Sequence, residues 1–352
     1  MSEPHRLTVL DDRRAALETC GYCPKLCRST CPVSEVEGRE PLIPWGKMAL
    51  TWYVARGELA PDRDVAELPW ACTGCLNCRE RCEHKNPVAP TLLAARAVFR
   101  DQGLAPLGSE RAHARFEARH ASLQARAREL GTPGADSERA LVVGCGYLAG
   151  RDRVARDVVR AGAALGATRV LQGCCGHAFR ATGDAERADR ERAALLAEAG
   201  GRKLVVADAG CAEELRGAGA TTLFELAASH PDRLSRITPS GGPVRYHDPC
   251  RLARGLGVIE EPRLILERAF GAKPAEFERR GTDGACSGAG GLLPFTRGAT
   301  ARSIARERLA EHRALGGGTL VTGCAASLRW FRAQGEKALD LASVLARSLA
   351  GG

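Results

Sequence analysis

Two tight groups of four cysteines are the residues of this chain whose type and spacing point most directly to chemistry. The first quartet is Cys20-x2-Cys23-x3-Cys27-x3-Cys31, and the second quartet is Cys72-x2-Cys75-x2-Cys78-x3-Cys82. Four thiolates on a tetrahedral frame can hold either an iron–sulfur cubane or a zinc ion. A zinc ribbon separates its two cysteine pairs by about 12–20 residues. Here the second pair follows the first almost at once, so the spacing favours iron–sulfur clusters over zinc.

The spacing of both quartets resembles that of bacterial two-cluster ferredoxins, whose fourth cysteine binds the other cluster. The resemblance implies two [4Fe–4S] clusters with exchanged fourth ligands. The first cluster would use Cys20, Cys23, Cys27 and Cys82, and the second would use Cys72, Cys75, Cys78 and Cys31. The chain departs from the motif in two places, because one extra residue precedes Cys27 and Glu83 stands where proline is expected. Neither departure removes a ligand.

The remaining seven of the 15 cysteines follow one pattern twice. The first copy carries Cys145, Cys174, Cys175 and Cys211, and the second copy carries Cys250, Cys286 and Cys324. Each copy alternates short β-branched runs with Ala- and Arg-rich helical stretches, which predicts α/β units with parallel strands. Because parallel strands end at the same edge of a sheet, the cysteines that follow strands are expected to gather there.

The order of these elements predicts a chain of four segments. Two stretches rich in Gly, Pro and Ser, residues 131–138 and 237–244, mark boundaries. Between the quartets the pattern is helical, with helices expected over residues 43–57 and 90–100 and no strand alternation. We expect an α-helical two-cluster domain, a helical linker, and two α/β cysteine-rich repeats with parallel sheets. These segments cover residues 1–105, 106–138, 139–238 and 239–352.

Both parts of the chain resemble known families. The helical region and its run Cys72-Thr-Gly-Cys75-Leu-Asn-Cys78 resemble the α-helical ferredoxin domains of succinate dehydrogenase iron–sulfur subunits and heterodisulfide reductase subunits. The repeats resemble the cysteine-rich "CCG" domain of heterodisulfide reductase, and of the iron–sulfur subunits of glycolate oxidase and anaerobic glycerol-3-phosphate dehydrogenase. The motifs that carry this likeness are Cys174-Cys175-Gly176, Tyr246-His247-Asp248-Pro249-Cys250 and Cys286-Ser287-Gly288.

The resemblance implies an iron–sulfur oxidoreductase subunit for electron transport. Electrons would come from a flavoprotein-type donor, such as a dehydrogenase or oxidase, and would cross the two [4Fe–4S] clusters. The acceptor would be a site in the cysteine-rich repeats or a membrane, quinone-linked partner. No constellation for hydrolysis or group transfer stands out, so the chemistry would belong to the cofactors.

Both repeats lack cysteines that the family's full five-cysteine repeat carries. Asp208 replaces one in the first copy, and Ser287 and Ser327 replace two in the second. These losses argue against the non-cubane cluster that cleaves disulfides in heterodisulfide reductase. The four cysteines of the first copy remain candidates for a third centre, iron–sulfur or zinc, with His177 or Asp208 as additional donors.

The three cysteines of the second copy are candidates for a further site, in which His247 would complete the coordination of a metal. The alternative for both copies is that these are residual cysteines packed in a core, since free cysteine is commonly buried and inert. For His247 we favour a structural role, because a His-Asp-Pro turn orders the loop after a strand.

Net charge does not by itself indicate nucleic-acid binding. The 51 basic and 42 acidic residues give a formal charge of +9, yet only six of the basic residues are lysines and aromatic residues make up 5%. Two clusters with four thiolates each would lower the net charge to about +5. A helix expected over residues 108–130 places Phe116, Leu123 and Leu130 on one packing face, with its arginines on a solvated face.

The N-terminal residues lack the apolar core of a signal peptide, and no apolar run is long enough to span a membrane. We therefore expect a cytoplasmic protein that reaches a membrane only through a partner, in a compartment where clustered cysteines bind metal. Two alternatives remain open. One is a non-catalytic zinc-binding scaffold or interaction protein, and the other is a thiol/disulfide reductase.

Overall fold

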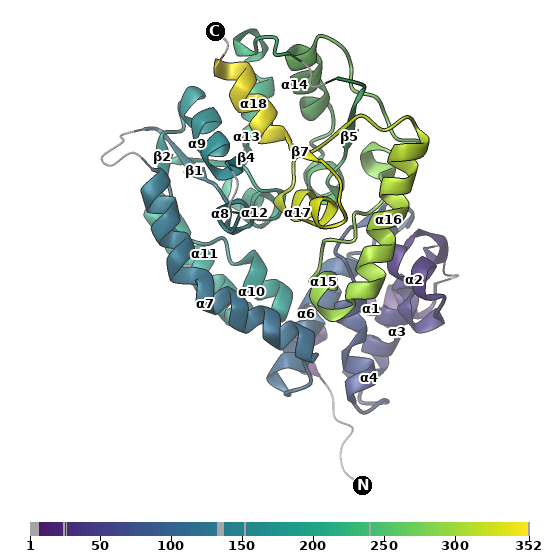
Figure 1. Cartoon of the computed structure of the whole chain (residues 1–352). Helices are drawn as coiled ribbons and strands as arrows, with labels where there is room; N and C mark the ends of the chain where they lie inside the picture. The colour runs from purple at the N-terminus through teal and green to yellow at the C-terminus, as the bar shows by residue number, and fades with distance from the viewer. Residues whose placement is uncertain are drawn as a thin grey trace. The chain divides into compact units, whose positions relative to one another are not determined.

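The computed structural model describes residues 7–23, 25, 27–131, 137–150, 153–238 and 241–350, and its elements are shown in Figure 1. The chain forms two compact units, and each unit is built from three segments that are separated in the sequence. Unit 1 comprises Met1–Phe116, Ala178–Arg187 and Cys286–Arg306, and unit 2 comprises Glu117–His177, Ala188–Ala285 and Glu307–Gly352. Unit 1 therefore contains both quartets together with one segment from each cysteine-rich copy.

Unit 1 is helical, and its described residues contain no strand. Its helices are α1 (Arg14–Gly21), α2 (Pro32–Glu37), α3 (Pro44–Ala55), α4 (Arg63–Ala66), α5 (Asn77–Glu80), α6 (Val88–Asp101), α15 (Leu293–Thr296) and the first parts of α7 (Leu107–Leu130) and α16 (Gly298–Ala314), together with most of α10 (His177–Thr182). The helices expected over residues 43–57 and 90–100 are α3 and α6. Both α2 and α3 begin with proline, whose fixed φ suits the first helical turn.

The core of unit 1 joins helices that flank the two quartets. Leu17, Met48, Trp70, Leu92 and Phe99 are buried in one cluster. Because α1, α3 and α6 all contribute to it, the short loops that carry the cysteines are held between well-packed helices.

Unit 2 contains two parallel sheets, as the alternation of strands and helices predicts. The first sheet has the order β2-β1-β3-β4, formed by β1 (Arg139–Val142), β2 (Arg169–Val170), β3 (Lys203–Val206) and β4 (Thr221–Thr222). The second has the order β5-β6-β7, formed by β5 (Val244–His247), β6 (Thr319–Thr322) and β7 (Leu339–Asp340). On the side of β5 that does not pair with β6, Arg245 forms a parallel bridge with Ala275. This bridge corresponds to β2, which lies beside β1 at the edge of the first sheet. The two sheets therefore have the same topology, and the repeat is confirmed.

The helices of unit 2 tie the two copies into one body. They are α8 (Cys145–Leu148), α9 (Val154–Ala164), α11 (Ala185–Ala199), α12 (Ala209–Leu215), α13 (Leu223–Ala228), α14 (Glu260–Phe270), α17 (Ala325–Ala333) and α18 (Leu341–Ala350). The last helix of each copy packs on the first long helix of the other, since α18 contacts α9 and α13 contacts α14 (Figure 1). Their side chains share one hydrophobic core.

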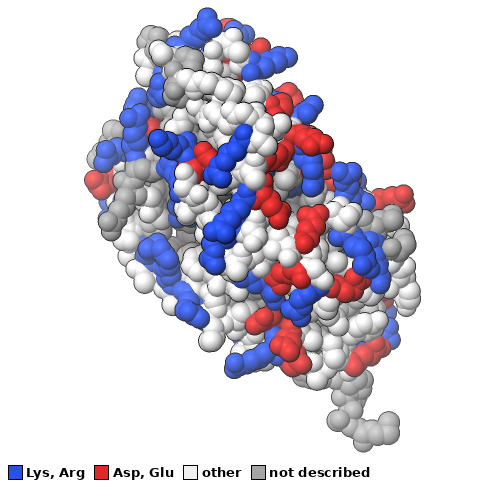
Figure 2. Space-filling model, turned by 45° about the vertical axis from the view of Figure 1, so that its right-hand side comes forward, with Lys and Arg blue, Asp and Glu red and all other residues white. Residues whose placement is uncertain are grey.

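The expected helix over residues 108–130 is α7. Phe116 packs on the core of unit 1, and Leu123 and Leu130 pack on the core of unit 2, so the apolar stripe serves packing. Of its arginines, Arg126 donates to the carbonyl of Gly150, and Arg128 donates to Gln172 at 3.0 Å. Figure 2 shows acidic and basic side chains interspersed on the face in view. Within the described residues, no helix is both long and apolar enough to cross a lipid bilayer.

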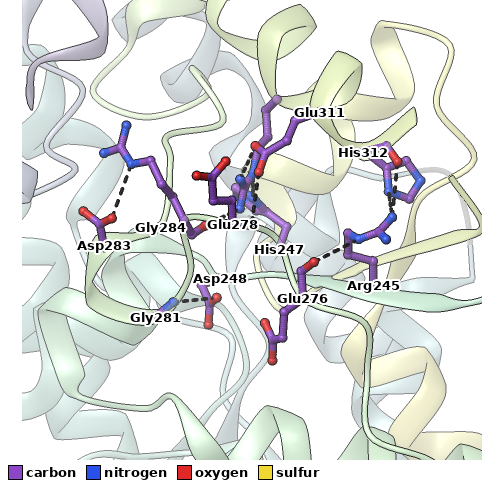
Figure 3. A network of polar contacts seen from close by, with 12 residues as sticks. Arg245, His247, Asp248, Glu276, Glu278, Gly281, Asp283, Gly284, Glu311 and His312 are labelled. Atoms are coloured by element: carbon purple, nitrogen blue, oxygen red, sulfur yellow. Dashed lines mark hydrogen bonds and ion pairs between the residues drawn. The ribbon is translucent and has the colours of Figure 1, made fainter. Parts of the chain in front are cut away.

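A buried polar network orders the loop after β5 (Figure 3). Asp248, which is 3% exposed, accepts hydrogen bonds from the Gly281 amide and from both terminal nitrogens of Arg263 at 2.9–3.0 Å. Arg263 also binds Glu276, and these two carboxylates raise the pKa of its guanidinium against the opposing effect of its own burial. The network therefore holds a buried carboxylate by charge and by hydrogen bonds.

His247 belongs to the same region and is 1% exposed. Its Nδ1 accepts a hydrogen bond from Arg308 at 3.3 Å, and its ring meets Phe331 edge-on at 4.9 Å. Burial, and then the charges of Arg308 and Arg254, hold the pKa of His247 well below its usual range. These contacts support the structural role that the sequence favours for this histidine.

Arg263→Met should destabilise unit 2 by about 3–5 kcal/mol, because Asp248 would remain buried without its cation. Arg279→Met is the matched control: the Arg279–Asp283 pair is 40% exposed on both sides, and its loss should cost about 0–1 kcal/mol. Urea unfolding of the two variants measures the difference. Equal losses of stability would contradict the role assigned to Arg263.

Candidate metal centres

Three cysteines of the first quartet line one cavity in unit 1 together with Cys82 of the second quartet. Cys20 lies in the last turn of α1, and Cys23 and Cys27 follow this helix. Cys82 lies in the segment that follows α5. These four cysteines border a cavity of about 120 Å³, together with Thr19, Trp45, Cys78, Glu83, His84, Asn86 and Val88. The structure thus places Cys82, remote in sequence, on the same cavity as Cys20, Cys23 and Cys27.

Hydrogen bonding and burial act on the thiol of Cys20 in opposite directions. Burial raises the pKa of Cys20 to about 12, while the hydrogen bond from Asn86 opposes this rise. Cys27, Cys23 and Cys82 raise this pKa further as neighbouring charges. The Asn86 amide donates to the Cys20 sulfur at 3.0 Å and to the Ala16 carbonyl at 2.8 Å. A donor already directed at this sulfur suits a thiolate ligand.

The second quartet is gathered with Cys31. Cys72 precedes a loop in which Gly74 and Leu76 have φ of 68° and 63°, and this left-handed path turns the chain back into α5, where Cys78 lies. Burial, and then the charges of Cys72, Cys75, Cys31 and Cys27, raise the pKa of Cys78 well above its usual range. Cys78 is therefore an electrostatic neighbour of Cys31 as well as of its own quartet.

Three donors that the sequence analysis did not identify stand beside these cysteines. Lys47 of α3 donates a hydrogen bond to the Cys31 sulfur at 3.4 Å, and the Gly74 amide donates one to the Cys72 sulfur at 3.4 Å. The third is the Asn86 amide, which donates to the Cys20 sulfur. A lysine within the apolar run of α3 is a signal that sequence reading could have used. Asn86 follows the second quartet with no comparable signal.

The segment of the second copy that carries Cys286 packs on the second quartet. Its Gly288 amide donates to the Cys286 sulfur at 3.3 Å. Further along, a Cβ placed on Gly291 would overlap the carbonyl of Cys72, and one on Gly290 would overlap that of Thr73. Glycine is needed here because two backbones are in direct contact.

The four cysteines of the first copy gather at the carboxyl ends of the strands of unit 2. Cys145 follows β1, Cys174 and Cys175 follow β2, and Cys211 lies in α12 after β3. The sulfurs of Cys175 and Cys211 are 3.1 Å apart. Burial raises the pKa of Cys145 to about 12, with Cys174 and then Asp208 adding to the shift. The expected edge therefore collects all four thiols.

The additional donors considered for the first copy have structural partners. Asp208 caps α12, because its Oδ1 accepts from the amides of Gly210 and Cys211 at 3.0 and 3.4 Å. His177 lies 3.6 Å from Glu214, and burial lowers its pKa. Both side chains order the cysteine loops.

The cysteines of the second copy are divided between the units, since Cys286 belongs to unit 1 while Cys250 and Cys324 belong to unit 2. Burial, and then the charge of Asp208, raise the pKa of Cys324, so this thiol is a neighbour of Asp208 in the first copy. Within the described residues, no three or more His, Cys, Asp or Glu side chains are arranged to hold a single metal ion.

Comparisons with known proteins match both the quartet region and the two cysteine-rich copies. Residues 16–86 match the family described as 4Fe-4S dicluster domain, and residues 140–216 and 244–329 match the family described as Cysteine-rich domain. The chain is 24% identical over 314 residues to one component of the dihydromethanophenazine:CoB--CoM heterodisulfide reductase of Methanosarcina barkeri, and this match covers 77% of each protein. It is 30% identical over 164 residues to one component of the fumarate reductase (CoM/CoB) of Methanothermobacter marburgensis, a match that covers 44% of this chain and 32% of that protein.

Gly291→Ala should disturb the second quartet, because the new methyl group would force the loop away from Cys72. Gly38→Ala is the matched control, since Gly38 has φ of 62° against 60° for Gly291 but has open space around its Cα. The control should cost about 1–2 kcal/mol from the left-handed backbone alone. The melting temperature and the iron content should both fall further in Gly291→Ala than in Gly38→Ala. Identical behaviour of the two variants would show that the contact is unimportant.

Proposed function

We propose that this chain relays electrons from a flavoprotein-type donor to an acceptor at its cysteine-rich repeats or in a membrane, quinone-linked partner. The chain is an iron–sulfur protein with a 4Fe–4S dicluster domain and two cysteine-rich domains, and it is homologous to components of a heterodisulfide reductase and a fumarate reductase. The observation that carries the proposal is the proximity of the cysteines of unit 1: Cys82 borders one cavity with Cys20, Cys23 and Cys27, and Cys31 acts on Cys78 with Cys72 and Cys75. A bound [4Fe–4S] cluster supplies reversible one-electron transfer.

The proposed ligand sets have exchanged fourth members. Cys20, Cys23 and Cys27 would be completed by Cys82, and Cys72, Cys75 and Cys78 by Cys31. The shared cavity, which Cys78 also borders, supports the first set, and the effects of Cys72, Cys75 and Cys31 on the pKa of Cys78 support the second. The donors Asn86 and Lys47, aimed at Cys20 and Cys31, are the interactions that hold thiolate ligands in place.

A third centre would use Cys145, Cys174, Cys175 and Cys211. The 3.1 Å separation of two of these sulfurs and the convergence of all four on one sheet edge support this assignment for iron–sulfur or zinc. A further site from Cys250, Cys286 and Cys324 has less support, because these residues belong to different units.

Thiol/disulfide reduction is the second candidate, and the close pair Cys175 and Cys211 is the observation in its favour. These thiols are only 2% and 4% exposed, however, and burial is among the causes that raise the pKa of both. The thiolate is the nucleophile in disulfide exchange, so burial of this kind suits a metal centre better. Turnover of a small disulfide by the metal-free protein with a reduced dye would reverse this preference.

Protein purified without oxygen should contain about eight iron atoms and eight sulfides if only unit 1 binds clusters, and about twelve of each with a third cubane. Cys145→Ser should reduce about twelve irons to about eight. Iron and sulfide analysis with EPR of the reduced protein provides the measurement. Colourless protein that holds stoichiometric zinc after anaerobic reconstitution would overturn the proposal and favour the zinc scaffold.

The exchanged ligand sets predict which substitutions act alike. Cys82→Ser should alter the same EPR signal as Cys23→Ser, and Cys31→Ser should alter the same signal as Cys75→Ser. Cys78→Ser should lose or convert one cluster. If Cys82→Ser instead pairs with Cys75→Ser, each quartet binds its own cluster and the exchange is wrong.

A further inference from the structure

Lys47 is a buried cation whose hydrogen bonds lead to the second cluster's ligands. The side chain is 1% exposed, and its ammonium donates to the Cys31 sulfur at 3.4 Å and to the Ala71 carbonyl at 2.8 Å. Neither group is a carboxylate. Since a buried ammonium is costly without a nearby negative charge, a thiolate at Cys31 is the natural counter-charge.

Arg96 places a second buried cation beside the same proposed ligand set. It is 1% exposed and donates to the Cys72 carbonyl at 2.8 Å and to the Pro69 carbonyl at 2.9 Å. Another bond, at 2.8 Å, reaches the Ala181 carbonyl in α10, which also belongs to unit 1. Two buried positive charges therefore lie beside the ligands proposed for the second cluster.

The ligand set proposed for the first cluster, Cys20, Cys23, Cys27 and Cys82, has a different electrostatic environment. Its buried donor is the neutral amide of Asn86, and Glu83 borders its cavity. The nearby Lys25 is 35% exposed, lies 3.7 Å from Glu40 and stacks on Trp45. Its charge is thus screened by solvent and paired with a carboxylate, unlike the charges of Lys47 and Arg96.

We propose that Lys47 and Arg96 give the second cluster, with its proposed ligands Cys72, Cys75, Cys78 and Cys31, the higher reduction potential, so that electrons pass from the first cluster to the second. Each reduction, [4Fe–4S]²⁺ to [4Fe–4S]⁺, adds one electron and one negative charge. A buried cation in low dielectric stabilises the product of that step. The inference rests on the proposed function with its exchanged ligand sets.

The direction of transfer agrees with the packing inside unit 1. The segment around Gly290 and Gly291 lies against Cys72 and Thr73, and it carries Cys286 of the second cysteine-rich copy. The site of higher potential is therefore the one that contacts a cysteine-rich segment. An external donor would deliver its electron to the first cluster.

The test is a potentiometric titration of the whole protein, followed by EPR. The wild-type protein should reduce in two steps, with the higher-potential signal altered by Cys75→Ser and the lower one by Cys23→Ser. Lys47→Met should lower the higher midpoint by at least about 59 mV, a tenfold change in a one-electron equilibrium, and should leave the lower one in place. Lys47→Gln, which keeps an N–H donor without the charge, should act in the same direction.

Lys85→Met is the matched control, because Lys85 is 60% exposed and bound to Glu80. This substitution should leave both midpoint potentials within a few millivolts of the wild-type values, because solvent screens the charge of Lys85. If Cys23→Ser alters the higher-potential signal, or if Lys47→Met folds with both clusters and unchanged midpoints, the inference is wrong while the proposed function stands. If Lys47→Met loses iron, the wild-type assignment and Lys47→Gln still decide the question. Absence of both clusters from the wild type would instead refute the proposed function.

Discussion

Burial of sulfur is the constraint on which the rest of this structure depends. Burial raises the pKa of Cys20 to about 12, and it raises the pKa of Cys78 well above its usual range. Thiols in such surroundings keep their protons at neutral pH, yet a metal ligand has to be a thiolate. On the proposed assignment, iron replaces these protons, and its binding free energy contributes to the folding of unit 1. The donors Asn86 and Lys47 then act on thiolates that the metal has already stabilised.

Supporting the cysteines requires segments that are far apart in the sequence. Unit 1 takes one segment from each cysteine-rich copy, and within it Arg96 links the loop of the second quartet to α10. Unit 2 joins its copies by reciprocal packing, since α18 covers α9 while α13 covers α14. Asp208, which stands where the resemblance to the family's full repeat would place a cysteine, caps α12.

Local patterns made much of the architecture predictable. Cysteine spacing identified the quartets, apolar periodicity located α3 and α6, and β-branched runs located the parallel strands that bring the first copy's thiols to one edge. Long-range contacts were not predictable in this way. Nothing near Arg96 in the sequence indicates that its guanidinium meets Cys72 and Ala181, and nothing near Gly291 indicates contact with the second quartet. Such pairings depend on tertiary packing, which carries no short sequence period.

The basic composition of the chain is also better understood from its interior than from its surface. Lys47, Arg96, Arg245, Arg254 and Arg308 are each at most 5% exposed, although they count fully toward the formal charge of +9. The four arginines donate to backbone carbonyls of the loops and helix ends around them. Arginine suits this task because its planar group offers five donors and remains charged. The positive surplus is thus partly a structural device, and on the proposed assignment part of it neutralises the clusters from within. The net charge is for this reason a poor guide to the surface that a partner meets.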